Sequence, residues 1–103
     1  DGKEITSLTK EQLAEGVNLA LVRTPMLRQA LEVHDLTLKH NNVHFARWRT
    51  VQVPLEAMGD APTVQNAMKT LDALEMELIA QQRAKAQPKP HRFELVPQSV
   101  KSN

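Results

Sequence analysis

Apolar residues recur at three- and four-residue spacing along two long stretches of the chain, and polar residues fill most of the positions between them. This spacing is typical of an amphipathic helix. The first stretch opens with Thr24 and Pro25, which suit an N-cap and a first helical position. We predict one long helix over residues 24–53 and a second over residues 62–87, joined into an antiparallel hairpin. The fold class is therefore expected to be mainly α.

The first long helix carries a broad apolar stripe. Its members are Leu27, Leu31, His34, Leu38, Phe45 and Trp48, and Met26, Ala30 and Val33 widen it. One partner helix covers only one face, so a stripe this broad needs a further partner. The short first helix, another domain and another copy of the chain all remain open at this point.

Residues that disfavour helices are expected to interrupt or end this helix. Asn41 and Asn42 are poor helix formers and mark a place where the helix could kink or break. Pro54 is predicted to end the helix, since proline removes a backbone donor. Residues 54–62 contain two prolines and a glycine, and we predict a loop there.

A short helical element is predicted before the hairpin. Thr9 and Gln12 have the spacing of a capping box, and Gly16 suits the left-handed position that ends a helix. We therefore predict a short helix and connector over residues 9–22. Within it, residues 17–22 are apolar without a clear period, and they form buried connecting chain or a second short helical piece.

Both ends of the chain are expected to be extended. Asp1 and Gly2 form a two-residue hairpin-turn signal, so residues 1–8 are predicted as a strand stub. The chain holds no strand before this turn, and we expect a fragment of a longer protein. Residues 88–103 are predicted as an extended tail.

Composition narrows the function classes. The chain has 103 residues, 41% of them hydrophobic, and no apolar run long enough to cross a membrane. It contains no cysteine, which excludes disulfides, thiol catalysis and cysteine-ligated zinc. Thirteen basic residues against twelve acidic ones leave a net charge of +1. That balance argues against a protein that binds nucleic acid by bulk charge.

Two histidines invite a metal hypothesis. His40 and His44 lie four residues apart and share one face of the predicted helix, a spacing at which two imidazoles can hold one zinc ion. Zinc sites need three or four ligands, and no third ligand is apparent in the sequence. We therefore favour a polar cluster beside Asn41 and Asn42, with His34 buried or half-buried on the apolar stripe.

The run Arg47-Trp48-Arg49 has two interpretations. Such a run can bind nucleic acid or stack on a carboxylate ligand. The balanced net charge favours the simpler interpretation, in which the arginines solvate a helix face and the tryptophan anchors the core.

Catalytic groupings are missing from the sequence. The serines Ser7, Ser99 and Ser102 lie near the ends of the chain, and none occupies a Gly-x-Ser-x-Gly motif. No glycine-rich phosphate loop is present. Glu75 and Glu77 are expected to be solvated and to point to different faces of their helix. We assign no catalytic, cofactor-binding or metal-ligating residue to this chain.

Several blocks of sequence, in a fixed order, resemble the C-terminal region of SGNH/GDSL-type hydrolases. The blocks are residues 1–4 (DGKE), 8–20 (LTKEQLAEGVNLA), 24–26 (TPM), 44–49 (HFARWR) and 51–53 (VQV). The resemblance covers roughly residues 1–56 and, more loosely, the helix beyond. In that family the nucleophilic serine lies in a Gly-Asp-Ser block, and an Asp-x-x-His pair comes late in the catalytic domain. Neither block is present here, so no catalytic residue is carried over.

The resemblance implies that residues 1–103 form a single non-catalytic helical region. It would pack on an upstream α/β hydrolase domain of the parent chain or on a homo-oligomer partner, and residues 17–19 would approach the substrate cleft. The parent would cleave ester-linked acyl groups, with carbohydrate esters as one candidate, and would be secreted or periplasmic. No cofactor, nucleic-acid partner or membrane span is expected. The alternative is a free-standing helical interaction module that dimerises through residues 27–48 and has no enzymatic role.

Overall fold

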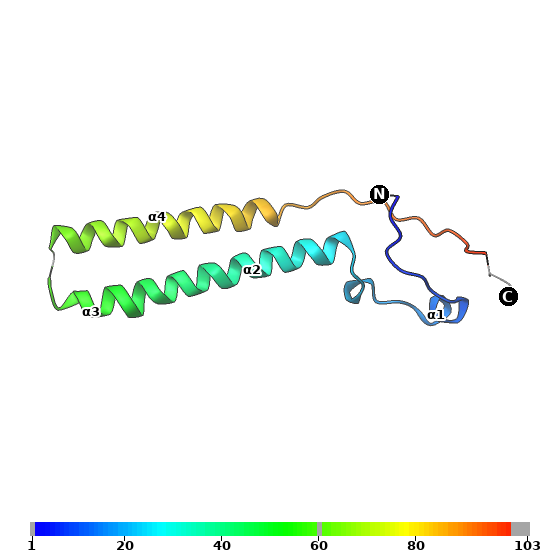
Figure 1. The fold of residues 1–103 in the computed structure, drawn as a ribbon, viewed down its shortest axis with the longest axis horizontal. Coiled ribbons are helices and arrows are strands. Elements are labelled where there is room, and N and C mark those ends of the chain that lie inside the picture. Colours follow the sequence, from blue (N-terminus) through cyan, green and yellow to red (C-terminus); the bar gives the residue numbers. More distant parts are fainter. Residues whose placement is uncertain (1, 60, 100–103) are drawn as a thin grey trace.

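The computed structural model describes residues 2–59 and 61–99, and in this part of the chain every regular element is a helix. The elements are α1 (Lys10–Glu15), a 3-10 turn η1 (Leu19–Leu21), α2 (Pro25–Phe45), a π-helical segment η2 (Ala46–Gln52), α3 (Val53–Glu56) and α4 (Pro62–Lys85). Figure 1 shows α2 and α4 side by side and antiparallel, with α3 at the closed end of the hairpin. The mainly α fold class is confirmed.

The molecule is long and thin. Its extents are 77 × 24 × 22 Å and its radius of gyration is 23.2 Å. A compact domain of about 100 residues has a radius of gyration of about 13 Å. In Figure 1 the N-terminal segment, α1 and the C-terminal tail lie beyond the open end of the hairpin, and the two long helices extend away from them. The shape therefore leaves both helices with large exposed faces.

The starts of α1 and α2 follow the predicted capping chemistry. The Thr9 hydroxyl accepts a hydrogen bond from the Gln12 backbone N–H at 3.1 Å, and the Gln12 side-chain oxygen accepts one from the Thr9 N–H at 2.9 Å. This reciprocal pair is the capping box. Thr24 caps α2 with its hydroxyl, which accepts a hydrogen bond from the Leu27 N–H at 3.0 Å. Local sequence thus sets both starting points.

The middle of the long helix differs from the prediction. The backbone of α2 continues through Asn41 and Asn42 without a break. The irregular segment lies later, in η2, where the helix widens to π geometry. Pro54 does not end the helix, since α3 continues to Glu56. The change from π to α geometry creates a new first turn at Val53, and proline is tolerated in a first turn.

The chain then turns toward α4. Gly59 has a φ of 72°, a left-handed conformation that glycine adopts without strain. Asp60 lies outside the described residues, and α4 begins at Pro62. The predicted loop over residues 54–62 is thus shortened at its start by α3.

The predicted strand stub is not formed in the described residues. Asp1 lies outside them, and residues 2–9 are irregular chain. A strand requires a neighbour for its backbone hydrogen bonds, and this segment lies instead against the C-terminal tail. The Ser7 hydroxyl lies 3.3 Å from the Gln98 side-chain oxygen, and the Gln98 amide donates to the Glu4 carboxylate at 3.2 Å. Residues 88–99 form neither helix nor strand, and residues 100–103 lie outside the described part.

The face of α2 that meets α4 includes Val33, from the edge of the predicted apolar stripe, but not the centre of that stripe. The contact face consists of half-buried or buried residues at alternating three- and four-residue spacing, the pattern of a coiled-coil seam. We call these residues the inner seam: Val33, Leu36, His40, Val43 and Arg47 on α2 and η2, and Met68, Leu71, Glu75, Leu78 and Gln82 on α4. Hydrogen bonds also link the two helices along this seam; for example, the Gln82 amide donates to the Thr37 hydroxyl at 3.0 Å. The hairpin is therefore held by a seam of mixed polarity.

The apolar stripe of α2 points away from α4. Leu31 is 58% exposed, Leu38 47%, Phe45 60% and Trp48 48%. We call these four residues the outer stripe. His34, expected to be buried or half-buried, is exposed as well. Among the described residues, Leu78 is the one buried apolar residue, at 8% exposure.

Candidate functional site

A polar cluster joins the two long helices at the inner seam. Glu75 of α4 is 9% exposed, and its Oε1 lies 2.5 Å from Nδ1 of His44 and 3.4 Å from Nε2 of His40. The two histidines are one helical turn apart, so both imidazoles reach the same carboxylate. The sequence prediction of a solvated Glu75 is therefore wrong. The signal that could have found it is its place between Leu71 and Leu78 in a regular three-four pattern.

Arg47 completes this cluster. Its Nη2 lies 2.7 Å from Oδ1 of Asp72, and its Nε lies 3.5 Å from Oε2 of Glu75. The Nε contact is electrostatic, because the geometry at this atom does not make a hydrogen bond. The Arg47 side chain is 21% exposed, whereas Trp48 is 48% exposed. The expected roles are reversed for this pair: Arg47 packs between the helices with acidic partners, and the neighbouring Trp48 faces outward.

The chemistry of this cluster is structural. An open groove of about 450 Å³ lies beside it, between Asn41 of α2 and Met76 and Ile79 of α4. Within the described residues, no three histidine, aspartate or glutamate side chains are arranged to hold a metal ion. His44 is in direct hydrogen-bonding contact with Glu75, which leaves no space for a cation between the two atoms. We interpret the cluster as a clamp between α2 and α4.

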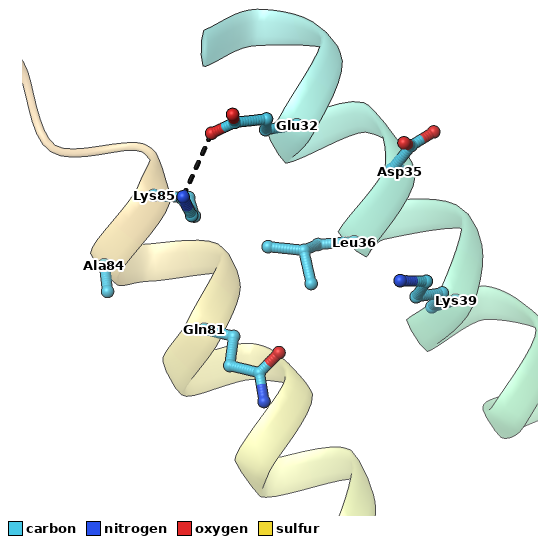
Figure 2. Close-up of a pocket in the computed structure, with 7 residues that line it drawn as sticks. All are labelled: Glu32, Asp35, Leu36, Lys39, Gln81, Ala84 and Lys85. Atoms are coloured by element: carbon cyan, nitrogen blue, oxygen red, sulfur yellow. Dashed lines mark hydrogen bonds and ion pairs between the residues drawn. The ribbon is translucent and has the colours of Figure 1, made fainter.

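A second groove lies between the helices near the open end of the hairpin. It has a volume of about 580 Å³ and is lined by the residues drawn in Figure 2. Leu36 projects between the helices, and the Lys85 ammonium lies 3.0 Å from the Glu32 carboxylate across the gap. The hydrogen bond and the charge of Lys85 lower the pKa of Glu32. The groove is open and its charged side chains balance one another, so it offers no cation or anion site.

The serines of the described residues form no catalytic grouping. Ser7 donates its hydroxyl hydrogen bond to Glu4 at 2.8 Å and lies beside Gln98. A nucleophilic serine requires a base within hydrogen-bond reach, and the hydrogen bonds of Ser7 include no histidine. Ser102 lies outside the described residues.

The outer stripe is the strongest candidate for a binding surface. Phe45 and Trp48 form an edge-to-face pair with ring centroids 6.3 Å apart. The Arg49 guanidinium carbon lies 6.0 Å from the centroid of the Trp48 ring. Tryptophan and arginine are the residue types that most often anchor protein interfaces. These side chains sit where α2 passes into η2, and π-helical turns frequently mark functional positions.

No family model, curated protein or solved structure matches this chain. Function is therefore inferred from the geometry of the molecule itself. Among the described helices, none is both long and apolar enough to cross a membrane. The candidate site is thus an exposed apolar surface on a helical hairpin, and its arrangement suits binding rather than bond cleavage.

Proposed function

We propose that this chain is a non-catalytic helical region of a serine-dependent ester hydrolase of the SGNH/GDSL type. The observation that carries the proposal is that the chain has almost no hydrophobic core of its own. Leu78 is the one buried apolar residue in the described part of the chain, while Leu21 and Leu95 are 81% and 82% exposed. A chain with so little internal burial gains stability by packing on another domain.

The open end of the hairpin is the surface that faces the catalytic domain in this proposal. Leu13 and Leu21 come from the segment around α1 and η1, and Phe93 and Leu95 come from the tail. Ser7, in the chain just before α1, lies 3.3 Å from Gln98 of the tail. Burying a leucine or phenylalanine fully contributes about 1.5–3 kcal/mol, so a few such side chains suffice to dock the region.

The resemblance to SGNH/GDSL-type hydrolases supports the same orientation. The block at residues 8–20, which carries much of the resemblance, lies at the open end. In the proposal the nucleophile, its histidine and aspartate and the oxyanion hole all belong to the catalytic domain. The reaction is cleavage of an acyl ester, and this chain contributes packing rather than a reacting group.

A free-standing interaction module is the second candidate function. The observation that favours it is the exposure of the outer stripe, which lies on the hairpin rather than at the open end. This function predicts a protein that folds and self-associates without any hydrolase domain. The two candidates differ in whether the open end needs a partner.

The reading frame upstream of Asp1 tests the first candidate. We expect a Gly-Asp-Ser block followed later by Asp-x-x-His, and a frame that lacks both overturns the assignment to a hydrolase. In the longer protein, Leu21→Asp and Leu95→Asp should lower the unfolding temperature, because these side chains become buried. Ser7→Ala tests whether this serine contributes to any ester hydrolysis by the chain itself. Hydrolysis of a model acetyl ester by the 103-residue chain, abolished by that change, would contradict a non-catalytic role.

A further inference from the structure

We infer that the outer stripe of α2 binds the outer stripe of a second copy of this chain, antiparallel, with Leu38 on the two-fold axis. The inference deepens the proposed function, because it names the subunit partner of the same helical region. It rests on the spacing of apolar residues between Leu27 and Trp48 and on the exposure of the four residues of the outer stripe. It therefore stands or falls separately from the hydrolase assignment.

The spacing of the outer stripe is nearly symmetric about Leu38. Leu31 precedes Leu38 by seven residues and Phe45 follows it by seven. Farther out, the half-buried Leu27, beside the outer stripe, lies eleven residues before Leu38, and Trp48 lies ten after it. A two-fold interface requires that when residue i contacts residue j of the partner, j also contacts i. A helix whose apolar residues mirror one another about a centre meets this requirement when two copies run in opposite directions.

Side-chain size also favours the antiparallel arrangement. It sets Leu31 against Phe45 of the second copy and Leu27 against Trp48 of the second copy, so a large ring always faces a smaller side chain. A parallel dimer sets Phe45 against Phe45 and Trp48 against Trp48, and it brings the two Arg49 side chains together. Alternating large and small residues pack more evenly than large against large.

The exposed area is sufficient for a modest dimer. Phe45 and Trp48 are 60% and 48% exposed, and aromatic side chains bury about 150–250 Å² each. Their exposed parts alone thus amount to about 200 Å². The face from Leu27 to Trp48 is about 32 Å long and about 10–12 Å wide, at 1.5 Å per residue and the usual helix diameter. Two such faces amount to about 640–770 Å² in total, which is below the about 1,200 Å² of stable interfaces, so the dimer is weak and dissociates on dilution.

Packing of the outer stripe on a catalytic domain would not require its apolar residues to be symmetric about Leu38. An interface between two different surfaces has no reason to be symmetric about one residue of α2. The symmetry about Leu38 is therefore the feature that selects a second copy over a hydrolase domain as the occupant of the outer stripe. The open end, with Leu21 and Leu95, remains available to the other partner.

Cross-linking tests both the partner and its direction. The chain has no cysteine, so each introduced thiol is unique. With a short bis-maleimide, Leu38→Cys should form a covalent dimer. Leu31→Cys and Phe45→Cys should each stay monomeric alone, since like positions are fourteen residues or about 21 Å apart in the antiparallel dimer, and should cross-link when mixed. Self-cross-linking by all three variants, or by none, overturns the proposal.

Sedimentation equilibrium of the 103-residue chain supplies the second test. We expect a dimer that dissociates on dilution, and Leu38→Asp should weaken association at least tenfold because two carboxylates meet on the axis. Leu74→Asp is the matched control, since Leu74 is a leucine of similar exposure on α4, 41% against 47% for Leu38. A monomer at every concentration overturns the dimer.

The two proposals fail in different ways. If the 103-residue chain is monomeric and Leu38→Asp lowers the unfolding temperature of the longer protein, the outer stripe belongs to the catalytic domain and the dimer is wrong. If the dimer forms and the upstream frame lacks Gly-Asp-Ser, the dimer stands and the hydrolase assignment is wrong.

Discussion

His44 of α2 and Glu75 of α4 meet across the hairpin, with Nδ1 and Oε1 2.5 Å apart. His40 approaches the same carboxylate at 3.4 Å, and Arg47 pairs with Asp72 one turn away at 2.7 Å. Burial of charged groups is costly unless they are paired, so these partners limit how α2 and α4 can slide past each other. We interpret the cluster as the feature that sets the register of the hairpin.

Loss of the Glu75 carboxylate should destabilise the hairpin. We expect Glu75→Ala to lower the free energy of unfolding by about 1–3 kcal/mol, because two histidines and Arg47 lose a buried acceptor. Glu77→Ala is the matched control, since it makes the same chemical change on an exposed face of α4 and should cost about 0.5 kcal/mol or less. Urea unfolding followed by circular dichroism measures both. Equal costs would contradict the clamp.

Leu78 and Leu38 should differ sharply as alanine variants. Leu78 is 8% exposed and Leu38 is 47% exposed. We expect Leu78→Ala to cost about 2–5 kcal/mol, because a cavity opens in the inner seam. Leu38→Ala should cost about 0.5 kcal/mol or less in dilute solution, where the outer stripe is free. Thermal unfolding of the two variants at low concentration decides which face of α2 meets α4. A larger loss of stability for Leu38→Ala than for Leu78→Ala would mean that the outer stripe meets α4.

The cap of α2 should contribute measurably to stability. Thr24 is 2% exposed, and its hydroxyl accepts the Leu27 N–H hydrogen bond at 3.0 Å. Thr24→Ala should lower the free energy of unfolding by about 1 kcal/mol. Thr24→Ser keeps the hydroxyl and should retain most of the stability. If serine and alanine behave alike, methyl packing rather than capping explains the burial of Thr24.

Acid should weaken the contact between Glu32 and Lys85. The hydrogen bond and charge of Lys85 hold the pKa of Glu32 below its usual value of 4.5. A lowered folded-state pKa adds stability that is fully present above the unfolded-state pKa and is lost as the pH falls through the folded-state pKa. Wild type should therefore lose more stability than Glu32→Gln between neutral pH and a pH below 4.5. Urea unfolding across that interval measures the difference, and parallel pH profiles would contradict it.

The capped starts of the helices were predictable because their causes are local. Thr9 with Gln12 and Thr24 with Pro25 satisfy orphan backbone groups within four residues, and no other part of the chain is needed. The apolar spacing likewise predicted two long helices with a connection near residues 54–62. These features account for the mainly α fold class.

Features that depend on neighbours were predicted less well. The strand stub lacked a partner strand among the described residues, and Pro54 was accommodated by the new first turn after η2. Asn41 and Asn42 remain helical because tertiary packing of α2 along α4 outweighs their weak propensity.

By itself, then, the sequence determined where the helices begin, their approximate lengths and the composition of each face, since all of these follow from neighbours along the chain. The tertiary structure decided which face of α2 meets α4. Periodicity singles out the most apolar stripe, Leu31 to Trp48, but the contact is made by the inner seam, where His40 and Arg47 reach Glu75. Glu75 lies 35 residues from His40 and 28 from Arg47 along the sequence. Pairing of a buried carboxylate with side chains of another helix is a non-local relation, which the pattern of either helix alone does not contain.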